Sequence, residues 1–235
     1  MEAALYLFPV TLGETSLEAV LPAYNHEIIL QIRHFFVEDV RSARRFLKKV
    51  SQEVDIDGIT FYPIGKHAST EHFAVHLNLI KQGIPMGVLS EAGCPAVADP
   101  GADVVAIAQR EGLKVVPLVG PSSMILSVMA SGFNGQSFAF NGYLPIDPGE
   151  RTRRIKSLEQ RVYTEHQTQL FIETPYRNAK MIEELLRTCR PQTKLCIAAG
   201  ITCAEEYIRT LTIQEWKRTK RPDLSKIPAI FLLYK

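Results

Sequence analysis

The chain has 235 residues, of which 46% are apolar and 22% charged, with a formal net charge of +2. This composition is typical of a soluble globular protein with one large domain or two small ones, and the charge alone gives no sign of a nucleic-acid binder. No apolar run reaches membrane-spanning length, and the first residues lack the features of a secretion signal, so we expect a cytoplasmic protein without membrane contact. The four cysteines show no Cys-x-x-Cys spacing, which predicts reduced thiols rather than disulfides or a zinc site.

Short apolar runs alternate with amphipathic stretches in the first half of the chain. The apolar runs are brief, rich in β-branched or aromatic residues and bounded by turn residues, as is typical of buried strands. They cover residues 5–10, 34–38, 59–64, 86–90 and 113–120. Helical periodicity fills the gaps at 40–50, 70–83 and 102–112. Strands that alternate with helices predict a parallel sheet with helices packed on it.

The second half of the chain has a different texture, with longer charged helices and a terminal group of strands. Helical patterns cover 121–132, 151–162 and 176–189, and strand patterns cover 137–145, 169–175, 194–201, 205–211 and 228–234. The adjacent strands at 205–211 and 229–234 predict a mixed, partly antiparallel sheet. We place a boundary near 116–120, which gives two α/β domains, 1–117 and 118–235.

The stretch VLSEAGCPAVADPG, residues 88–101, follows a predicted strand and carries acids, prolines and glycines. Ser90 and Glu91 stand at the carboxyl end of that strand, where ligands bind in open α/β sheets. A stiff loop with carboxylates suits a ligand that bears hydroxyls or positive charge, whereas a phosphate-binding P-loop needs a lysine that is absent here. The alternative is an ordinary strand–helix connection in which Asp99 caps the next helix.

Two further strand ends have the same form. The segment VGPSSM, residues 119–124, offers backbone N–H groups and two hydroxyls at a helix start, although these groups can equally be helix caps. The segment FIETPYR, residues 171–177, is another strand that ends in an acid and a proline. Three such loops in two domains predict a cleft for a small polar molecule.

The block from Ser90 to Pro145 resembles the tetrapyrrole-methylase-type, or class III, S-adenosylmethionine-dependent methyltransferases. Within them it is most similar to the branch that methylates a ribose hydroxyl of small-subunit ribosomal RNA. The stretch LYLFPVTLG resembles that branch's first strand and loop. The segment VEDVR, 37–41, is similar to its Glu-Asp-Thr-Arg motif, and ETPYR, 173–177, to its Glu-Ser-x-x-Arg motif.

The resemblance runs from about residue 4 to 234 and implies two α/β domains with S-adenosylmethionine in the cleft between them, usually in a homodimer. Glu91 stands where the family usually has Asp. Carried over position by position, the cofactor-binding residues are Leu12, Ser90, Glu91, Cys94, Ser122, Ser123, Met124, Ile172, Ala199 and Pro228.

The sequence departs from the ribosomal branch at several charged positions. The family's Arg-Glu-x-Thr-Lys run keeps only Thr202, because Ala199, Gly200 and Cys203 replace its charged members. Its Lys-Gly-Glu element keeps only Lys226, and the asparagine of its first loop is Glu14. The acceptor therefore stays open among ribosomal RNA of the 30S subunit, a tetrapyrrole, a modified protein residue and another small molecule, and a cofactor- or RNA-binding homologue without catalysis is a further alternative.

Methylation of a ribose hydroxyl benefits from a nearby base, because the hydroxyl is a poor nucleophile. By resemblance and strand-end position the candidate bases are Glu38, Asp39 and Glu173. The candidate substrate-binding residues are Arg41, Arg177 and Lys226, as contacts to phosphate or carboxylate. Alternatively, Glu38 and Arg41 form a local ion pair.

Basic clusters at 41–49, 151–156 and 217–222 are either solvated helix faces or phosphate contacts. His72 and His76 have helical i, i+4 spacing, but without an evident third ligand we predict no metal site. His67 is a weak site candidate, and we expect Trp216 to serve in packing.

Overall fold

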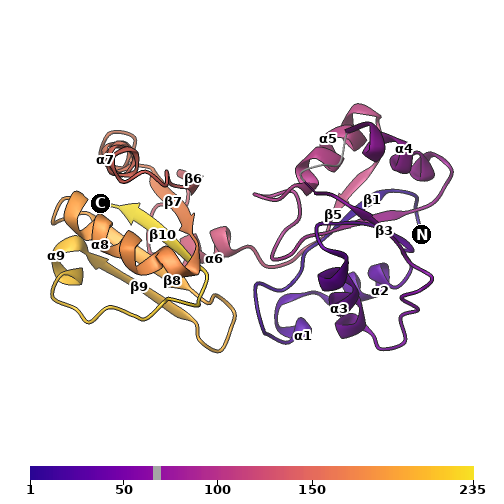
Figure 1. Cartoon of the computed structure of the whole chain (residues 1–235), viewed down its shortest axis with the longest axis horizontal. Helices are drawn as coiled ribbons and strands as arrows, with labels where there is room; N and C mark the ends of the chain where they lie inside the picture. The colour runs from indigo at the N-terminus through magenta and orange to yellow at the C-terminus, as the bar shows by residue number, and fades with distance from the viewer. Residues whose placement is uncertain (66–69) are drawn as a thin grey trace. The chain divides into compact units, whose positions relative to one another are not determined.

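The computed structural model describes residues 1–65 and 70–235, and it comprises two compact units, Met1–Ser122 and Ser123–Lys235 (Figure 1). The first unit extends a few residues past the predicted boundary at 117 because the segment after it is bonded to the same unit. Leu118 N donates to Leu7 O at 3.1 Å, and Asn25 Nδ2 donates to Val119 O at 2.7 Å.

The first unit is built on a parallel sheet, as predicted. Its strands are β1 (Leu5–Phe8), β2 (His34–Val37), β3 (Thr60–Pro63), β4 (Met86–Leu89) and β5 (Val115–Pro117). They lie in the order β3-β2-β4-β1-β5, and each neighbouring pair is parallel. In such a sheet the carboxyl ends of all strands lie at one edge, so the loops after β1, β2 and β4 share it.

Helices cover both faces of this sheet, α4 and α5 on one side and α1 to α3 on the other (Figure 1). They are α1 (Leu17–Val20), α2 (Ala23–Ile29), α3 (Val40–Val50), α4 (Thr70–Lys81) and α5 (Gly101–Arg110). Alternate strand residues enter the two cores: Phe35 packs with Leu47 of α3, and Phe36 packs with Phe73 of α4. The last three helices were predicted, whereas α1 and α2 were not.

The second unit contains the predicted mixed sheet. Its strands are β6 (Phe138–Tyr143), β7 (Thr168–Glu173), β8 (Lys194–Ala199), β9 (Tyr207–Thr212) and β10 (Ala229–Tyr234), in the order β6-β7-β10-β8-β9. The β6–β7 pair is parallel and the other pairs are antiparallel. Although β9 and β10 follow one another in the chain, they are not neighbours in the sheet, because β8 lies between them.

Helices again cover this sheet. They are α6 (Ser123–Ser131), α7 (Pro148–Thr164), the 3-10 turn η1 (Pro175–Arg177), α8 (Asn178–Thr188) and α9 (Ile213–Trp216). Residues of α7, α8 and α9 form one core with β7, β8 and β10, while α6 packs against β10 and β9. Trp216 is fully buried and its Nε1 donates to Leu195 O at 2.9 Å, which confirms its predicted role in packing.

No helix in the described part of the chain is both long and apolar enough to cross a membrane.

Candidate functional site

The loops after β1 and β4 are bonded to each other at the carboxyl edge of the first sheet. Val10 N donates to Gly93 O at 2.9 Å, and the buried Ser90 Oγ donates to the same oxygen at 3.0 Å. Gly93 has a φ of +72°, and a Cβ built on it would lie 3.1 Å from Cδ2 of Leu12. The structure therefore brings Leu12 and Ser90 together around a position that requires glycine.

The loop after β5 joins the same edge. Cys94 Sγ donates to Pro121 O at 3.4 Å, and that oxygen lies 3.4 Å from the Cβ position of Gly93. Ser122 follows directly and is half-buried. Of the predicted cofactor residues in this unit, Leu12, Ser90, Cys94 and Ser122 are thus positioned on connected loops.

Asp99 folds the remainder of the β4 loop. Its Oδ1 accepts from Ala96 N at 3.1 Å and from Gly101 N, the first residue of α5, at 2.7 Å. Ala96 and Ala98 both have positive φ, 66° and 56°. The structural alternative for Asp99 is therefore seen in part: its carboxylate holds the loop against the start of α5, although Pro100 occupies the cap position.

Three carboxylates gather at this edge. Burial raises the pKa of Glu38, and the negative charges of Asp99 and Glu91 raise it further. No ion pair or side-chain hydrogen bond to Glu38 occurs within residues 1–65 and 70–235, so the alternative of a local Glu38–Arg41 pair is not observed. Glu38 is thus a carboxylate in an anionic surrounding, which is suited to accepting a proton or facing a cation.

Asp39 has a different environment. Its Oδ1 accepts from Ser42 N at 2.7 Å and caps the N-terminus of α3, and these bonds lower its pKa. A carboxylate held in this way is a weak base. Arg41, the candidate substrate residue in the first turn of the same helix, is exposed.

A polar pocket of about 330 Å³ opens between the β1 loop, α3 and the end of β4. Ser90 and Glu91 line it, together with Glu14, Arg45 and Lys49. Lys49 Nζ donates to Thr15 O at 2.7 Å and holds the β1 loop against α3. This pocket offers hydroxyl, carboxylate and cationic groups to a small polar ligand.

The predicted cofactor residues of the second unit lie at one end of its sheet. Ala229, the first residue of β10, pairs with Glu173 of β7 on one side and Ala199 of β8 on the other. Gly200 N donates to Pro228 O at 3.1 Å. Ile172, Ala199 and Pro228 are thereby brought together by strand register, whereas Ser123 and Met124 lie at the start of α6 and share no printed bond with them.

Glu173 is buried and paired. Its Oε2 accepts from Arg177 at 2.6 Å, its Oε1 accepts from Thr174 N at 2.7 Å, and its side chain is 1% exposed. Hydrogen bonding to Glu173 raises the pKa of Arg177. This carboxylate therefore fixes the η1 turn, a role that differs from the proton acceptor suggested by its strand-end position.

Lys226 is exposed in the loop before β10, beside the start of α8. The buried Asn178 Nδ2 donates to Leu224 O at 3.1 Å and to Ile227 O at 2.9 Å, and so ties that loop to η1 and α8. Arg177 and Lys226 consequently belong to the same end of the unit.

Thr202 stands out among the residues that were not predicted as site members. It has a φ of +70°, which is a genuine outlier for a β-branched residue. Its hydroxyl is buried without a hydrogen-bond partner, and its N–H donates to Glu206 Oε2 at 2.8 Å. Its retention from the family motif is the sequence signal that marks this position.

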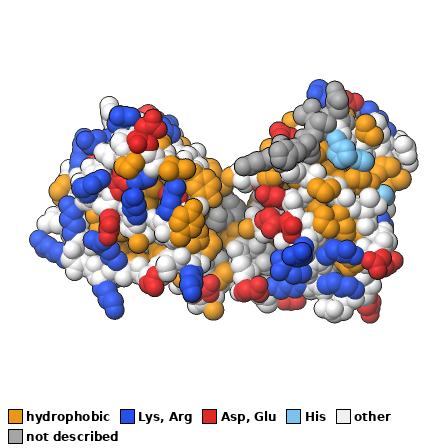
Figure 2. All heavy atoms as spheres, viewed as in Figure 1, with side chains coloured by type: hydrophobic (Ala, Val, Ile, Leu, Met, Phe, Trp, Pro, Cys, Tyr) orange, Lys and Arg blue, Asp and Glu red, His pale blue; other side chains and the backbone are white. Residues whose placement is uncertain are grey.

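The basic clusters have mixed roles. Arg151 is buried, with Nε 2.5 Å from Glu184 Oε2, and Arg154 donates to Asn141 Oδ1 at 2.9 Å. The cluster at 151–156 is thus largely structural rather than a solvated face. Figure 2 shows basic side chains spread over the visible face of Ser123–Lys235, whereas in Met1–Ser122 they form a group with acidic side chains beside it.

The histidines do not form a larger cluster. His72 Nε2 and His76 Nε2 are 3.2 Å apart on α4. Across residues 1–65 and 70–235, no three His, Cys, Asp or Glu side chains are arranged to hold a metal ion. His67 lies outside the described residues.

Comparison with known proteins gives consistent sequence relatives. No family model matches the chain. It is 30% identical over 209 residues to Ribosomal RNA small subunit methyltransferase I of Streptococcus pyogenes, which covers 87% of this chain and 67% of the relative. The protein of the same name from Vibrio cholerae is 27% identical over 214 residues, 90% of this chain and 69% of the relative. For the Thermotoga maritima protein, 36% identity extends over 47% of each chain.

Solved structures share the fold at low sequence identity. The methyltransferase CobJ matches with a TM-score of 0.62 and 14% identity, over 99% of this chain and 94% of that one. The uroporphyrin-III C-methyltransferase of Thermus thermophilus, complexed with S-adenyl homocysteine, matches with a TM-score of 0.54 and 18% identity, over 99% and 97%. The predicted α/β class with two units of tetrapyrrole-methylase type is confirmed.

Proposed function

The chain belongs to the Ribosomal RNA small subunit methyltransferase I family, and from this premise we propose that it transfers a methyl group from S-adenosylmethionine to a ribose hydroxyl of small-subunit ribosomal RNA. Two observations support the proposal. The relatives of that name match along most of this chain, and the loops carrying the predicted cofactor residues are bonded to one another at the edge of the first sheet.

The chemistry of this edge fits the cofactor. S-adenosylmethionine, when bound, supplies a methyl group on a positively charged sulfur. Glu38, Glu91 and Asp99 provide negative charge that favours a cation over a phosphate, and Gly93 leaves space where a Cβ would contact Leu12. Ser90 and the neighbouring backbone supply polar groups for a nucleoside. The residues at the end of the second sheet, Ile172, Ala199 and Pro228, are proposed as apolar and backbone contacts to the same cofactor.

Transfer requires that the ribose oxygen form a bond to the methyl carbon while the carbon–sulfur bond breaks, with the hydroxyl proton leaving to a base. Glu38 is the proposed base, because its carboxylate has no cation partner among the described residues and its raised pKa makes it a better proton acceptor than Asp39 or Glu173. Arg177 and Lys226 are proposed contacts to RNA phosphates. Orientation of the two reactants supplies most of the remaining acceleration.

We further propose that the enzyme acts in the cytoplasm as a homodimer on the 30S subunit. The resemblance to the ribosomal branch supports these three points, and the names of the relatives support the RNA substrate.

The direct test is methylation of 30S subunits purified from a strain that lacks its own methyltransferase of this family. We expect radioactive methyl from S-adenosylmethionine to enter the small-subunit RNA, and nuclease digestion with mass spectrometry to place it on a ribose. Label on a base would refute the proposed acceptor atom. Cofactor binding without any label in RNA would refute the RNA substrate.

A further inference from the structure

Two tyrosines at one end of the second unit are unusually exposed. Tyr143 at the end of β6 is 61% exposed, and Tyr176 in η1 is 76% exposed. Phe138, the next most exposed ring of this fully described unit, is 38% exposed. Exposure of an aromatic ring carries no stabilising burial, so rings held open in this way indicate a contact with another molecule.

Tyr143 is placed by a bulge in the β6–β7 ladder. Phe140 pairs with Leu170, but the next pair is Tyr143 with Ile172, so β6 contains one extra residue. Gly142 has a φ of +63° within the bulge. The irregularity sets Tyr143 directly opposite Ile172, a proposed cofactor residue.

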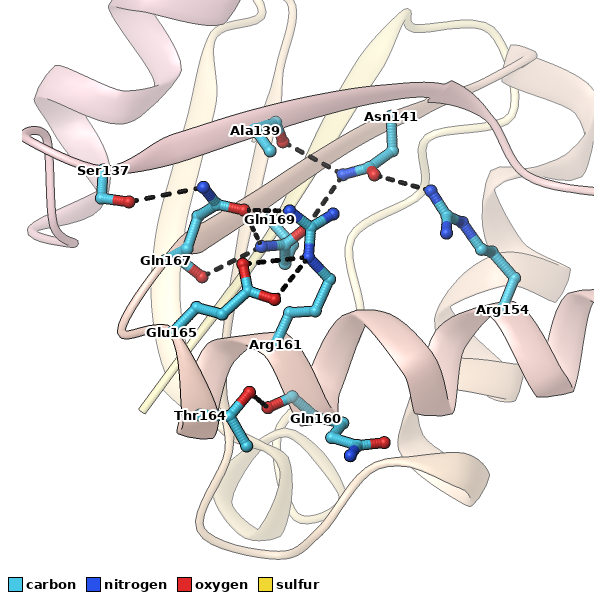
Figure 3. A network of polar contacts seen from close by, with 10 residues as sticks. All are labelled: Ser137, Ala139, Asn141, Arg154, Gln160, Arg161, Thr164, Glu165, Gln167 and Gln169. Atoms are coloured by element: carbon cyan, nitrogen blue, oxygen red, sulfur yellow. Dashed lines mark hydrogen bonds and ion pairs between the residues drawn. The ribbon is translucent and has the colours of Figure 1, made fainter.

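The bulge is stabilised by side-chain bonds (Figure 3). Asn141 Nδ2 donates to Leu170 O at 3.1 Å and to Gln169 Oε1 at 3.2 Å, and its Oδ1 accepts from Arg154 at 2.9 Å. These bonds replace the ladder contacts that the extra residue interrupts. A bulge held in this way re-aims the following side chain and is a built feature of the sheet.

Tyr176 is placed by the Glu173–Arg177 pair, which spans it. The phenol groups of Tyr143 and Tyr176 both lie close enough to the Arg177 guanidinium to raise its pKa. Arg177 retains 23% exposure of its side chain, and Lys226 belongs to the adjoining loop. Two aromatic rings therefore flank an immobilised cation at the end of the sheet that carries Ile172, Ala199 and Pro228.

We propose that Tyr143 and Tyr176 form a stacking surface for an unpaired base of the RNA substrate, next to the nucleotide whose ribose is methylated. Proteins that read RNA by sequence bind single-stranded nucleotides and stack the exposed bases on aromatic or Arg side chains, while cations contact the phosphates. This inference rests on the proposed RNA substrate.

The test compares Tyr143→Ala and Tyr176→Ala with Tyr143→Phe and Tyr176→Phe in the 30S methylation assay. Loss of one stacked base is expected to raise KM for 30S subunits about tenfold, whereas the Phe variants, which keep the ring, stay within about twofold of wild type. The affinity for S-adenosylmethionine, measured by calorimetry, should be unchanged in all four variants. Tyr24→Ala removes a 57% exposed tyrosine from the first unit and serves as the matched control.

Two outcomes would overturn the stacking surface. One is a KM for 30S subunits that both Ala variants leave unchanged in an active enzyme. The other is an equal loss in the Phe and Ala variants, which would assign the effect to the hydroxyl groups. If wild-type protein binds the cofactor but methylates no RNA, the proposed function itself fails, and that result is distinct from both.

Discussion

The carboxyl edge of the first sheet and the corresponding end of the second carry the same residue type in opposite electrostatic settings. In the first, Glu38 lies beside Asp99 and Glu91, and its pKa is raised. In the second, Glu173 is buried and bonded to Arg177 and Thr174. The comparison shows that position after a strand does not define the role of a carboxylate, because its neighbours decide whether it is available or occupied.

The two edges therefore divide the proposed work. An edge of unpaired negative charge favours a cationic cofactor and a proton acceptor. An edge whose charges are mutually satisfied keeps a fixed shape and presents Tyr143, Tyr176 and Arg177 outward. Four predictions follow from this division, in order of decreasing effect.

The largest effect is expected from Glu38→Gln, which keeps the shape of the side chain but cannot accept the proton. General-base catalysis contributes typically 10²–10⁴-fold, so we expect kcat in 30S methylation to fall by about 10²–10³-fold. Glu173→Gln tests the contrast, because its loss should act through stability. A Glu38→Gln enzyme with wild-type kcat would remove Glu38 from the chemistry.

The pH dependence of the same reaction sharpens the assignment. A base acts when deprotonated, so kcat/KM should rise with pH through the pKa of Glu38, which lies above the ordinary value for Glu. Glu91→Gln removes a neighbouring negative charge, and the rising limb should then move to lower pH. An unmoved limb in this variant would indicate that another group titrates.

A smaller effect, on stability, is expected at the second edge. Glu173→Ala leaves Arg177 without its buried partner. Breaking a buried pair costs about 3–5 kcal/mol, and because Arg177 is 23% exposed and regains some water we expect a loss of about 2–3 kcal/mol of unfolding free energy. Glu38→Ala should change it by less than about 0.5 kcal/mol. Urea unfolding of both variants measures the difference, and equal losses would contradict the comparison.

The smallest effect is expected at Thr202, where the second edge does carry strain. Thr202→Gly relieves a positive φ and removes a buried hydroxyl without a partner, at the entropic cost of a glycine. We expect a net gain of about 0.5–1 kcal/mol in urea unfolding. Thr202→Ala keeps the backbone strain and should gain less; a Gly variant that is less stable than the Ala variant would show that the strain is not costly.

Much of this architecture follows from the sequence. Brief apolar runs and helical periodicity predicted each strand of the first sheet, and the rule that ligands bind beyond strand ends predicted which loops meet. The cap formed by Asp39 was also legible, because an Asp directly before a helical pattern is a typical N-cap.

Other features depend on contacts between distant residues. The buried Arg151 is indistinguishable in sequence from its exposed neighbours, since its partner Glu184 lies on another helix. The bulge at Asn141 requires Gln169 and Arg154, and an Asn-Gly pair alone equally suits a hairpin turn. The contrast between Glu38 and Glu173 likewise requires knowledge of which charges surround each carboxylate.

The measurement that tests the central claim most directly is calorimetric titration of S-adenosylmethionine into wild-type protein, Glu91→Ala and Ile172→Glu. These variants change one proposed cofactor contact in each unit. The account predicts clear binding by wild type and weaker binding by both variants, each of which must remain folded by circular dichroism. Absence of binding by folded wild-type protein at millimolar cofactor, or undiminished binding by both variants, would contradict it.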